Sequence, residues 1–428
     1  MDLLQLLSTK NNVIIIQDHD KRFTWKQIKA LIAGTQQELE SRTAKSCAIL
    51  SDNTLEFVVS FLACSYLGVD ILLPPNDSQQ MIERAQADAY VGKFEQSIVI
   101  KPSTNEIVNN SINPSVTIFT SGSTGQPKGI SRKLNQLFKE VDEINLMWGD
   151  TIPSKIFTST VSYQHIYGLL FCILWPLKKG HIIWNKILSF EESLQVLTNK
   201  FKQVVLISSP AFLKRTTDHT IEISEKMQVY CSGGVLTKEQ HANATTVLKS
   251  DVIQVYGSTE TGGIAHKSLN CSWQFFPSVR HKTENNILFV KSPFCYTNQW
   301  QNTCDIITID EKGFELIGRS DRIVKIEEKR VSLIQVEEAI QQHDLVKEVH
   351  IISMHNSRQY LAAVIVLENK GDEELMQHGE RDMKKNIKSF LHDKIERLAI
   401  PKQIRFLDEL PTNSQGKILH HQLEGLFK

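Results

Sequence analysis

Hydroxyl groups, glycines and one lysine are concentrated between Thr120 and Gly129, in the stretch TSGSTGQPKG. Successive backbone N–H groups in a glycine-rich turn can surround an anion, and hydroxyl side chains add further donors. Lys128 contributes a positive charge. The β-branched run VTIF comes directly before the stretch, so we expect this loop at the end of a strand. These features favour a phosphate-binding loop over a solvated linker.

The order of residues in this stretch excludes the common P-loop. That pattern reads GxxxxGK[ST] and leads directly into a helix. Here Lys128 comes before Gly129, and Pro127 precedes the lysine. The loop therefore belongs to a different kind of phosphate chemistry.

Strand-like apolar runs alternate with helix-like runs through most of the chain. NVIIIQD is followed by a helix that we expect to begin at Thr24, and SCAILSDN by an apolar helix that we expect to end at Gly68. Four more apolar runs, KIFTSTV, QVVLISSP, MQVYCSGG and DVIQVYGSTE, each end in a polar or glycine-rich turn. This alternation predicts an α/β fold with a partly parallel sheet. Because ligands of such sheets bind at the carboxyl ends of strands, we expect the chemistry there.

The chain becomes more charged after Gly318. VHIISMHN and QYLAAVIVLEN predict a β-hairpin, and RDMKKNIKSFLHDKIERL predicts an amphipathic helix. We therefore predict a second, small α+β domain in this region.

Composition narrows the range of functions. Among 428 residues, 48 Lys and Arg balance 48 Asp and Glu, so no overall field attracts nucleic acid or an anionic membrane. Seven scattered cysteines without CxxC spacing indicate buried thiols rather than a disulfide framework or a zinc site. We find no signal-peptide pattern and no apolar run long enough for a membrane span, and we expect a cytoplasmic protein.

Six further segments follow the phosphate loop, and together they resemble the adenylate-forming superfamily. This family includes acyl-CoA synthetases, aryl-CoA ligases, peptide-synthetase adenylation domains and luciferases. The segments stand in the family's order: SYQHIYG, CSGGVL, VYGSTETGG, NTCDIITID, GRSDRIVKIEEKRVSLIQVEEAI and LPTNSQGKILHHQL. The resemblance implies a large N-terminal domain of several subdomains, with mixed sheets sandwiched by helices, at residues 1–317. A small mobile C-terminal lid domain would occupy residues 318–428.

The resemblance also implies a reaction. A carboxylate attacks the α-phosphate of ATP with the help of Mg²⁺ and gives acyl-AMP and pyrophosphate. The acyl group then passes to a pantetheine thiol, of coenzyme A or of an acyl carrier protein. Charge builds up on the phosphate oxygens, so catalysis depends mostly on positioning and electrostatics.

Residues at matching positions inherit roles from the family. Lys417 would bridge carboxylate and phosphate oxygens, Thr259 would contact the α-phosphate, and Glu260 would bind Mg²⁺. His165 would support acyl placement or thioester chemistry. Tyr256 would stack on adenine, and Asp305 and Arg319 would hold the ribose. The full set implied for nucleotide binding is Thr120, Ser121, Gly122, Ser123, Thr124, Gly125, Lys128, Gly233, Gly234, Tyr256, Gly257, Ser258, Asp305 and Arg319.

Purely structural roles are open for several of these residues. Asp305 and Arg319 could form an ordinary surface ion pair, and Tyr256 could be a core residue. His165 could be a structural histidine beside two aromatic residues. Lys417 could be one of many solvated lysines near the end of the chain. The positions of the residues within the motifs favour the functional roles of Asp305, Arg319 and Lys417.

Two positions depart from the family pattern. Cys304 stands where the family has glycine before Asp305, and we expect it to change the loop conformation but to leave the carboxylate. Glu328 replaces a glycine beside the thiol tunnel, whereas Arg330 matches. A carboxylate there favours a carrier protein slightly over free coenzyme A as the acceptor. We place the hinge between the domains at Asp321, in a short link that can absorb large φ/ψ changes.

Two other functions remain open at this point. The first is a stand-alone amino-acid adenylation enzyme, which usually pairs the substrate amine with an aspartate. The chain has no aspartate between Ile152 and Arg215, and this argues against it. The second is a non-catalytic nucleotide-binding protein of the same fold. A non-catalytic protein would be distinguished from an active enzyme by the loss of the charged site residues, but these are all present in the sequence.

Overall fold

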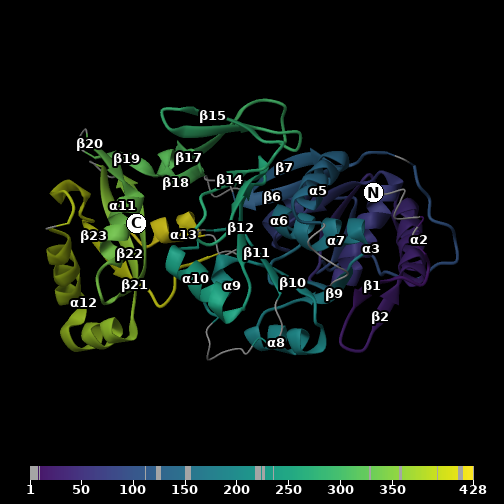
Figure 1. The fold of residues 1–428 in the computed structure, drawn as a ribbon, viewed down its shortest axis with the longest axis horizontal. Coiled ribbons are helices and arrows are strands. Elements are labelled where there is room, and N and C mark those ends of the chain that lie inside the picture. Colours follow the sequence, from purple (N-terminus) through teal and green to yellow (C-terminus); the bar gives the residue numbers. More distant parts are fainter. Residues whose placement is uncertain are drawn as a thin grey trace.

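A computed structural model describes residues 8, 10–110, 112–121, 127–149, 156–216, 223, 227–234, 236–326, 329–355, 359–392, 394–412 and 418–427. Figure 1 shows an elongated molecule, with the N-terminal sheets at one end and the last three strands with α12 at the other. The fold is α/β, with a large N-terminal domain of mixed sheets and helices and a smaller C-terminal domain, as predicted. In the described part of the chain, no helix is both long enough and apolar enough to cross a membrane.

The largest sheet among the described residues has nine strands, in the order β14-β13-β12-β11-β10-β8-β9-β1-β2. Its centre, from β9 through β8, β10 and β11 to β12, is parallel. The central strands β8 and β10 are buried throughout, which explains why their sequences are continuous apolar runs. The strands are β1 (Ile14–Gln17), β2 (Arg22–Thr24), β8 (Ile156–Ser159), β9 (Ile182–Ile187), β10 (Val204–Ser208), β11 (Gln228–Cys231), β12 (Val252–Ser258), β13 (Gly262–Lys267) and β14 (Gln274–Phe275).

A second sheet has the order β5-β3-β4-β6-β7. It is parallel except for the hairpin of β6 and β7. Its strands are β3 (Ser46–Leu50), β4 (Asp70–Leu73), β5 (Ala89–Gly92), β6 (Ser115–Ser121) and β7 (Pro127–Lys133). The helices associated with this sheet are α2 (Trp25–Ser41), α3 (Thr54–Leu67) and α4 (Gln79–Ala85).

Helix α2 begins, and helix α3 ends, at the residue that the sequence predicts. Thr24 is the N-cap of α2, and its backbone N–H donates to the Gln27 side chain at 2.8 Å. Gly68 ends α3 with a φ of 81°, a left-handed conformation that glycine adopts without steric cost. Nearly every residue of α3 is buried, which agrees with its uniformly apolar sequence.

The remaining helices of this region pack around the two sheets. They are α5 (Leu134–Trp148), α6 (Ile166–Gly168), the π-helix η2 (Leu169–Leu174), α7 (Trp175–Lys179), α8 (Glu191–Lys200), α9 (Pro210–Leu213) and α10 (Lys238–Val247). The main core cluster contains residues of α3, α5, η2 and both sheets, so a single apolar core holds these elements together.

A four-stranded antiparallel sheet leads toward the C-terminal end, in the order β15-β16-β17-β18. Its strands are β15 (Arg280–Glu284), β16 (Ile287–Lys291), β17 (Gln301–Asp310) and β18 (Gly313–Arg319). The short 3₁₀ helix η3 (Ser320–Arg322) follows and contains Asp321, the predicted hinge residue. The boundary between residues 317 and 318 remains a prediction.

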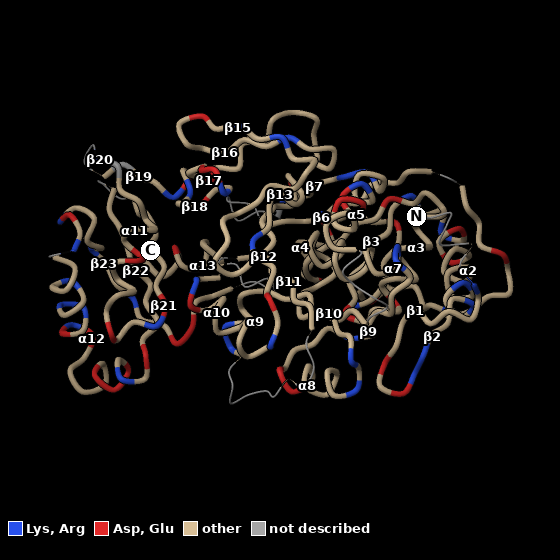
Figure 2. The backbone as a smooth tube through the Cα atoms, viewed as in Figure 1, with Lys and Arg blue, Asp and Glu red and all other residues tan. Residues whose placement is uncertain are grey.

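The last elements form the expected α+β arrangement. β21 (Val346–His355) and β22 (Gln359–Leu367) pair as the predicted antiparallel hairpin, and β23 (Gln403–Phe406) joins β22 in parallel. α12 (Asn369–His392) is interrupted at Gly379, where φ is 77°, and its second part starts close to Arg381, where the amphipathic helix was predicted, but ends at His392. The other elements are β19 (Ile323–Ile326), β20 (Lys329–Ser332), α11 (Leu333–Gln341), η4 (Arg397–Ala399) and α13 (His420–Gly425). Figure 2 shows Lys and Arg interspersed with Asp and Glu along α12.

A buried ion pair joins three of these elements. Arg132 Nη2 on β7 donates to Glu140 Oε2 on α5 at 2.9 Å, and the two side chains are 0% and 3% exposed. The other oxygen, Glu140 Oε1, accepts from the backbone N–H of Gly263 on β13 at 2.7 Å. Arg132 also donates to the carbonyl oxygen of Phe294. The pair therefore fixes the β6–β7 hairpin, α5 and the start of β13 relative to one another.

Glu140→Ala should destabilise the protein strongly, because it leaves the Arg132 charge buried without its partner. We expect the free energy of unfolding to fall by about 3–5 kcal/mol, measured by urea denaturation followed by circular dichroism. The double variant Arg132→Met with Glu140→Leu should recover most of the loss, since replacing both members of a buried pair by apolar residues is often neutral.

The matched control for this prediction is Glu284→Ala. Glu284 pairs with Lys282 at 2.6 Å, but both side chains are solvent-exposed. Its loss should cost about 1 kcal/mol or less. Equal effects of the two single variants would contradict a special role for the buried pair.

Candidate active site

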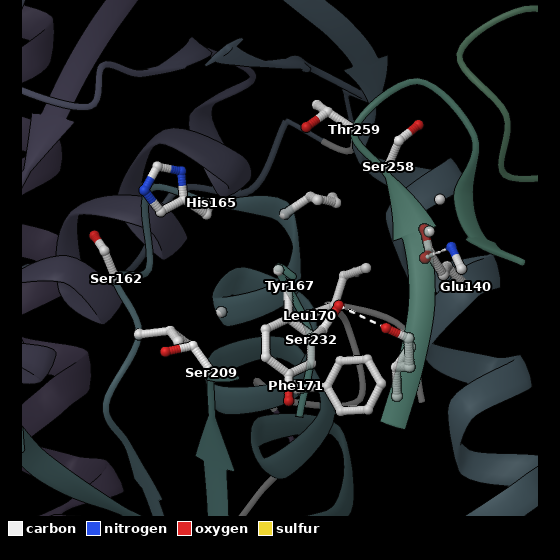
Figure 3. Close-up of a pocket in the computed structure, with 18 residues that line it drawn as sticks. Glu140, Ser162, His165, Tyr167, Leu170, Phe171, Ser209, Ser232, Ser258 and Thr259 are labelled. Carbon is white, nitrogen blue, oxygen red and sulfur yellow. Dashed lines mark hydrogen bonds between the residues drawn. The ribbon is translucent and has the colours of Figure 1, made fainter. Parts of the chain in front are cut away.

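A cavity of about 100 Å³ lies at one edge of the large sheet. Loops that follow several strands of this sheet form one part of its wall, and residues of α5 and η2 form another. Figure 3 shows the residues around it. The described residues that line it are Glu140, Val161, Ser162, His165, Ile166, Tyr167, Gly168, Leu170, Phe171, Ser209, Ser232, Gly233, Val255, Gly257, Ser258, Thr259, Gly262 and Gly263. Ser209 follows β10, Ser232 and Gly233 follow β11, and Thr259 follows β12. The cavity is thus at the carboxyl ends of the parallel strands, as the alternation of elements predicted.

The predicted phosphate loop is the turn of the β6–β7 hairpin. Thr120 on β6 pairs with Lys128 on β7, and Thr120 Oγ1 donates to the Lys128 carbonyl at 3.3 Å. Ser121 is the last residue of β6. The residue that follows the loop enters a strand, not a helix, which agrees with the exclusion of the P-loop pattern. Gly122, Ser123, Thr124 and Gly125 lie outside the described residues.

The turn between β12 and β13 brings Ser258 and Thr259 to the wall of the cavity. The strands approach closely at Gly257, because a Cβ atom there would overlap the carbonyl oxygen of Gly262. Ser258 Oγ and Thr261 Oγ1 are 3.0 Å apart and bond within the turn. The backbone carbonyl of Glu260 accepts from Tyr296 at 2.9 Å. Ser258 and Thr259 line the cavity, and half-buried Glu260 follows them directly.

Asp305 on β17 is held by two side chains that the sequence also identified. The hydroxyl of Tyr256 donates to Asp305 Oδ2, and Arg319 Nη1 donates to Asp305 Oδ1 at 3.1 Å. Burial raises the pKa of the Asp305 carboxyl above its usual value, while the Tyr256 hydrogen bond and the Arg319 charge act in the opposite direction. Arg319 also donates to both oxygens of Asp321, at 2.8 and 2.6 Å. These bonds connect Tyr256, Asp305, Arg319 and Asp321 in one network.

Tyr256 is also packed against aromatic residues. Its ring contacts those of Trp273 and Phe314 edge-on, with centroids 5.7 and 6.4 Å apart. Burial raises the pKa of the Tyr256 hydroxyl well above its usual value, so this group remains a proton donor to Asp305 at neutral pH. Stacking of Tyr256 on adenine, and the binding of ribose by Asp305 and Arg319, remain predictions.

Cys304 adopts a backbone conformation that favours glycine. Its φ is 61°, in the left-handed region. The Cys304 N–H donates to the Asn302 side chain at 2.8 Å, and the Asp305 N–H donates to Thr303 Oγ1 at 3.1 Å. The backbone at Cys304 thus has the conformation that a glycine would take without strain, and these bonds fix it just before the carboxylate.

Of the other predicted residues, His165 and Gly233 line the cavity. His165 is the N-cap residue of α6, is 8% exposed and lines the cavity. Gly233 also lines it and has a φ of 98°, which only glycine adopts readily. Gly234 is beside Gly233, and a Cβ atom there would meet Pro210 at an ordinary 3.6 Å. Lys128 is exposed on β7. Lys417 and Glu328 lie outside the described residues.

Two family models cover most of the chain. Residues 5–287 match the family described as AMP-binding enzyme, and residues 335–417 match the AMP-binding enzyme C-terminal domain. The chain belongs to the AMP-binding enzyme family. The resemblance found in the sequence is therefore confirmed.

Individual relatives of this AMP-binding enzyme are distant but match over long stretches. A 4-coumarate–CoA ligase of Cereibacter sphaeroides is 23% identical over 304 residues, which are 71% of this chain and 69% of the relative. A 2-succinylbenzoate–CoA ligase of Bacillus cereus is 24% identical over 482 aligned positions, covering 96% of this chain and 95% of the relative. The crystal structure of ATP-bound MatB from Rhodopseudomonas palustris has the same fold, with a TM-score of 0.82, 16% identity, and coverage of 100% and 98%.

The sequence analysis missed most of the wall of the cavity in this AMP-binding enzyme. Glu140 carried a usable signal, since a charged residue in the apolar face of a helix indicates a buried partner. That face consists of Leu137, Val141, Ile144 and Trp148. No comparable signal marks the remaining wall residues, because neither composition nor spacing shows which side of η2 or of a strand-end loop faces a cavity. They include Ser162, Tyr167, Leu170, Phe171, Ser209 and Ser232.

Cys304→Gly should stabilise this AMP-binding enzyme. A non-glycine residue in the left-handed region costs about 1–2 kcal/mol, and the entropy of an added glycine in the unfolded chain offsets about 0.4–1 kcal/mol of the gain. We expect a net increase of roughly 0.5–1 kcal/mol in the free energy of unfolding, measured by urea denaturation. Cys271→Gly is the matched control. Cys271 is exposed and has no positive φ, so the same substitution there should give no gain. A loss of stability from Cys304→Gly would show that the cysteine side chain contributes more than its backbone strain costs.

Proposed function

We propose that this AMP-binding enzyme joins a small carboxylic acid to a thiol in two steps at the cost of ATP. In the first step, a carboxylate oxygen forms a bond to the α-phosphorus of ATP. The bond between that phosphorus and the bridging oxygen breaks, and pyrophosphate leaves with the electron pair. In the second step, a thiolate sulfur attacks the acyl carbon, the C–O bond to AMP breaks, and AMP leaves with the electron pair. The thiol proton goes to solvent or to a nearby base.

One observation carries this proposal: the turn after β12 contributes Ser258 and Thr259 to the wall of the cavity. Other parts of the same wall are formed by Glu140, Tyr167 and Phe171. A phosphate held by the β12–β13 turn would therefore be next to an acyl group held in the cavity. Positioning the two reactants in this way accounts for much of the barrier reduction in such reactions. The β6–β7 hairpin would contribute its phosphate loop from the neighbouring sheet, since Arg132 and Glu140 join β7 to α5 and β13.

Glu260 is the residue that fits Mg²⁺. Its carboxylate is half-buried beside the predicted phosphate site, and carboxylate oxygen is a preferred ligand of this ion. In the described residues there is no group of three or more His, Cys, Asp or Glu side chains that could hold a metal. A single carboxylate suits Mg²⁺ that enters with ATP, because the phosphates and water supply its other ligands. When bound, the ion would neutralise charge on the phosphate oxygens.

For the second step we propose coenzyme A as the acceptor, with a carrier-protein pantetheine as the second candidate. The 4-coumarate and 2-succinylbenzoate relatives are both named as CoA ligases, which supports the first. The carboxylate of Glu328 motivates the second. The free thiols of all seven cysteines suit the reducing cytoplasm, where we expect this reaction to occur.

Amino-acid adenylation receives no support from the cavity. Glu140 lines the cavity and could pair with a substrate ammonium group, but its two oxygens already bond Arg132 and Gly263. Its charge is thus neutralised before any substrate enters. Against a non-catalytic role we count the charged residues that the family motifs assign to the site, since Glu260 and Asp305 are both retained in the chain.

Lys417→Ala should abolish the first step and spare the second. The family motif assigns Lys417 to the bridging of carboxylate and phosphate oxygens, and loss of such a preorganised charge should lower the rate by about 100-fold or more. The first step is measured as acid-dependent exchange of labelled pyrophosphate into ATP, and the second as thioester formation from supplied acyl-AMP. Lys347→Ala serves as the control, because Lys347 is an exposed lysine of β21 in the same domain. Wild-type exchange by the Lys417 variant would contradict its role, and a wild-type protein that shows no exchange with any acid and does not bind AMP would contradict the proposed function.

A further inference from the structure

We infer that the acid is short and uncharged at its distal end, with an acyl group smaller than a benzene ring. This inference rests on the proposed function and specifies its substrate class. It follows from the floor of the cavity, from what lies behind that floor, and from the charges of the lining residues.

Two aromatic rings close the cavity at the end away from Thr259. Tyr167 of α6 and Phe171 of η2 lie side by side there, as Figure 3 shows, with centroids 4.9 Å apart. Leu170, which is 2% exposed, lies next to them in the wall. An acyl chain that enters from the phosphate side therefore meets these rings end-on.

Among the described residues, large aromatic side chains fill the space behind Phe171. Phe171 packs on Trp148, Trp175 and Tyr230, with centroids 6.0, 5.8 and 5.5 Å away. Trp175 and Tyr230 are fully buried, and Trp148 is 7% exposed. These rings belong to the main core cluster, whose packing resists the displacement of large side chains. Phe171 is thus part of the packed core, whereas Tyr167, the other ring of the floor, is half-buried.

The size of the cavity sets the limit on the acyl group. It measures about 100 Å³. An apolar protein cavity of about 150 Å³ holds one benzene molecule. Part of the present volume also belongs to the phosphate end, at Ser258 and Thr259. An acyl group of about two to four carbons fits, and a phenyl group does not.

Charge restricts the distal end of the acid. Among the described lining residues, Glu140 is the only Asp, Glu, Lys or Arg, and His165 is the only histidine. Arg132 neutralises the charge of Glu140, and the N–H of Gly263 binds its other oxygen. No lining Lys or Arg could pair with a second carboxylate of the substrate. Hydroxyl groups of Ser162, Ser209 and Ser232 lie around the cavity, so a hydroxyl on a short acid would be tolerated. The acids in the names of the two relatives above both contain a benzene ring, so the present cavity differs in what it admits.

The experiment is pyrophosphate exchange by the wild-type protein with straight-chain acids of two to twelve carbons and with 4-coumarate. Each unmatched methylene changes discrimination by about 10-fold or more, so the best short acid should exceed dodecanoate by at least about 100-fold in kcat/KM. A preference for dodecanoate or 4-coumarate would overturn the inference and leave the proposed function intact.

If no acid supports exchange, calorimetry distinguishes a failure of the inference about the acid from a failure of the proposed function. The probes are AMP and acyl-sulfamoyl adenosines with a butanoyl or a dodecanoyl group. Tighter binding of the butanoyl analogue supports the inference, and tighter binding of the dodecanoyl analogue overturns it. Failure of AMP and of both analogues to bind overturns the proposed function and the inference with it.

A variant tests the floor itself. Phe171→Ala should raise the ratio of octanoate to butanoate turnover by about 10-fold or more, because it opens space beyond the present floor. Phe94→Ala is the matched control, since Phe94 is also buried (8% exposed, against 2% for Phe171) but belongs to a separate core cluster with Ala48 and Leu50. If Phe171→Ala does not fold, Tyr167→Ala, which replaces the half-buried ring of the floor, takes its place. An unchanged ratio in a folded floor variant would overturn the role of these rings.

Discussion

The buried ion pair of Arg132 and Glu140 is the interaction on which the site depends. Through this pair, β7 of one large sheet and β13 of the other are both bonded to α5. Apolar packing holds the same elements together. A buried pair of this kind contributes little net stability compared with an apolar replacement, but it is costly to break. It therefore acts as a geometric constraint: the phosphate-loop hairpin and the turn that carries Glu260 cannot move independently of the cavity wall. Glu143, one turn further along α5, adds a second bond by accepting from the backbone N–H of Ser278 at 2.6 Å.

Glycines complete this constraint where the backbone must approach closely. Gly257 lies opposite Gly263 across β12 and β13, and a Cβ atom at the neighbouring Gly262 would be 2.7 Å from Glu140 Oε2. Only hydrogen fits between the strand and the ion pair. The sequence GSTETGG thus combines two features: its glycines leave room for Glu140, and its residues Ser258 and Thr259 line the cavity.

Sequence reasoning was most successful where function and backbone geometry use the same residues. Strand ends, the Thr24 and Gly68 helix limits and the hairpin after Val346 were predictable, because turn residues and apolar runs report local conformation. The position of Glu140 in the apolar face of α5 indicates a buried partner, but the identity of that partner was not predictable, because Gly263 is 123 residues away. The floor of the cavity was missed for a related reason. Whether Tyr167 and Phe171 face a ligand or the core depends on the π-helical turn of η2, which their spacing alone does not reveal.

The central claim is that a carboxylate oxygen of the substrate bonds to the α-phosphorus of ATP. The most direct measurement uses a short acid labelled with ¹⁸O in its carboxylate, ATP and hydroxylamine as an acyl trap, with the products analysed by mass spectrometry. The account predicts that AMP carries one labelled oxygen and that pyrophosphate carries none. Label in inorganic phosphate together with ADP, or AMP formed without label, would contradict it.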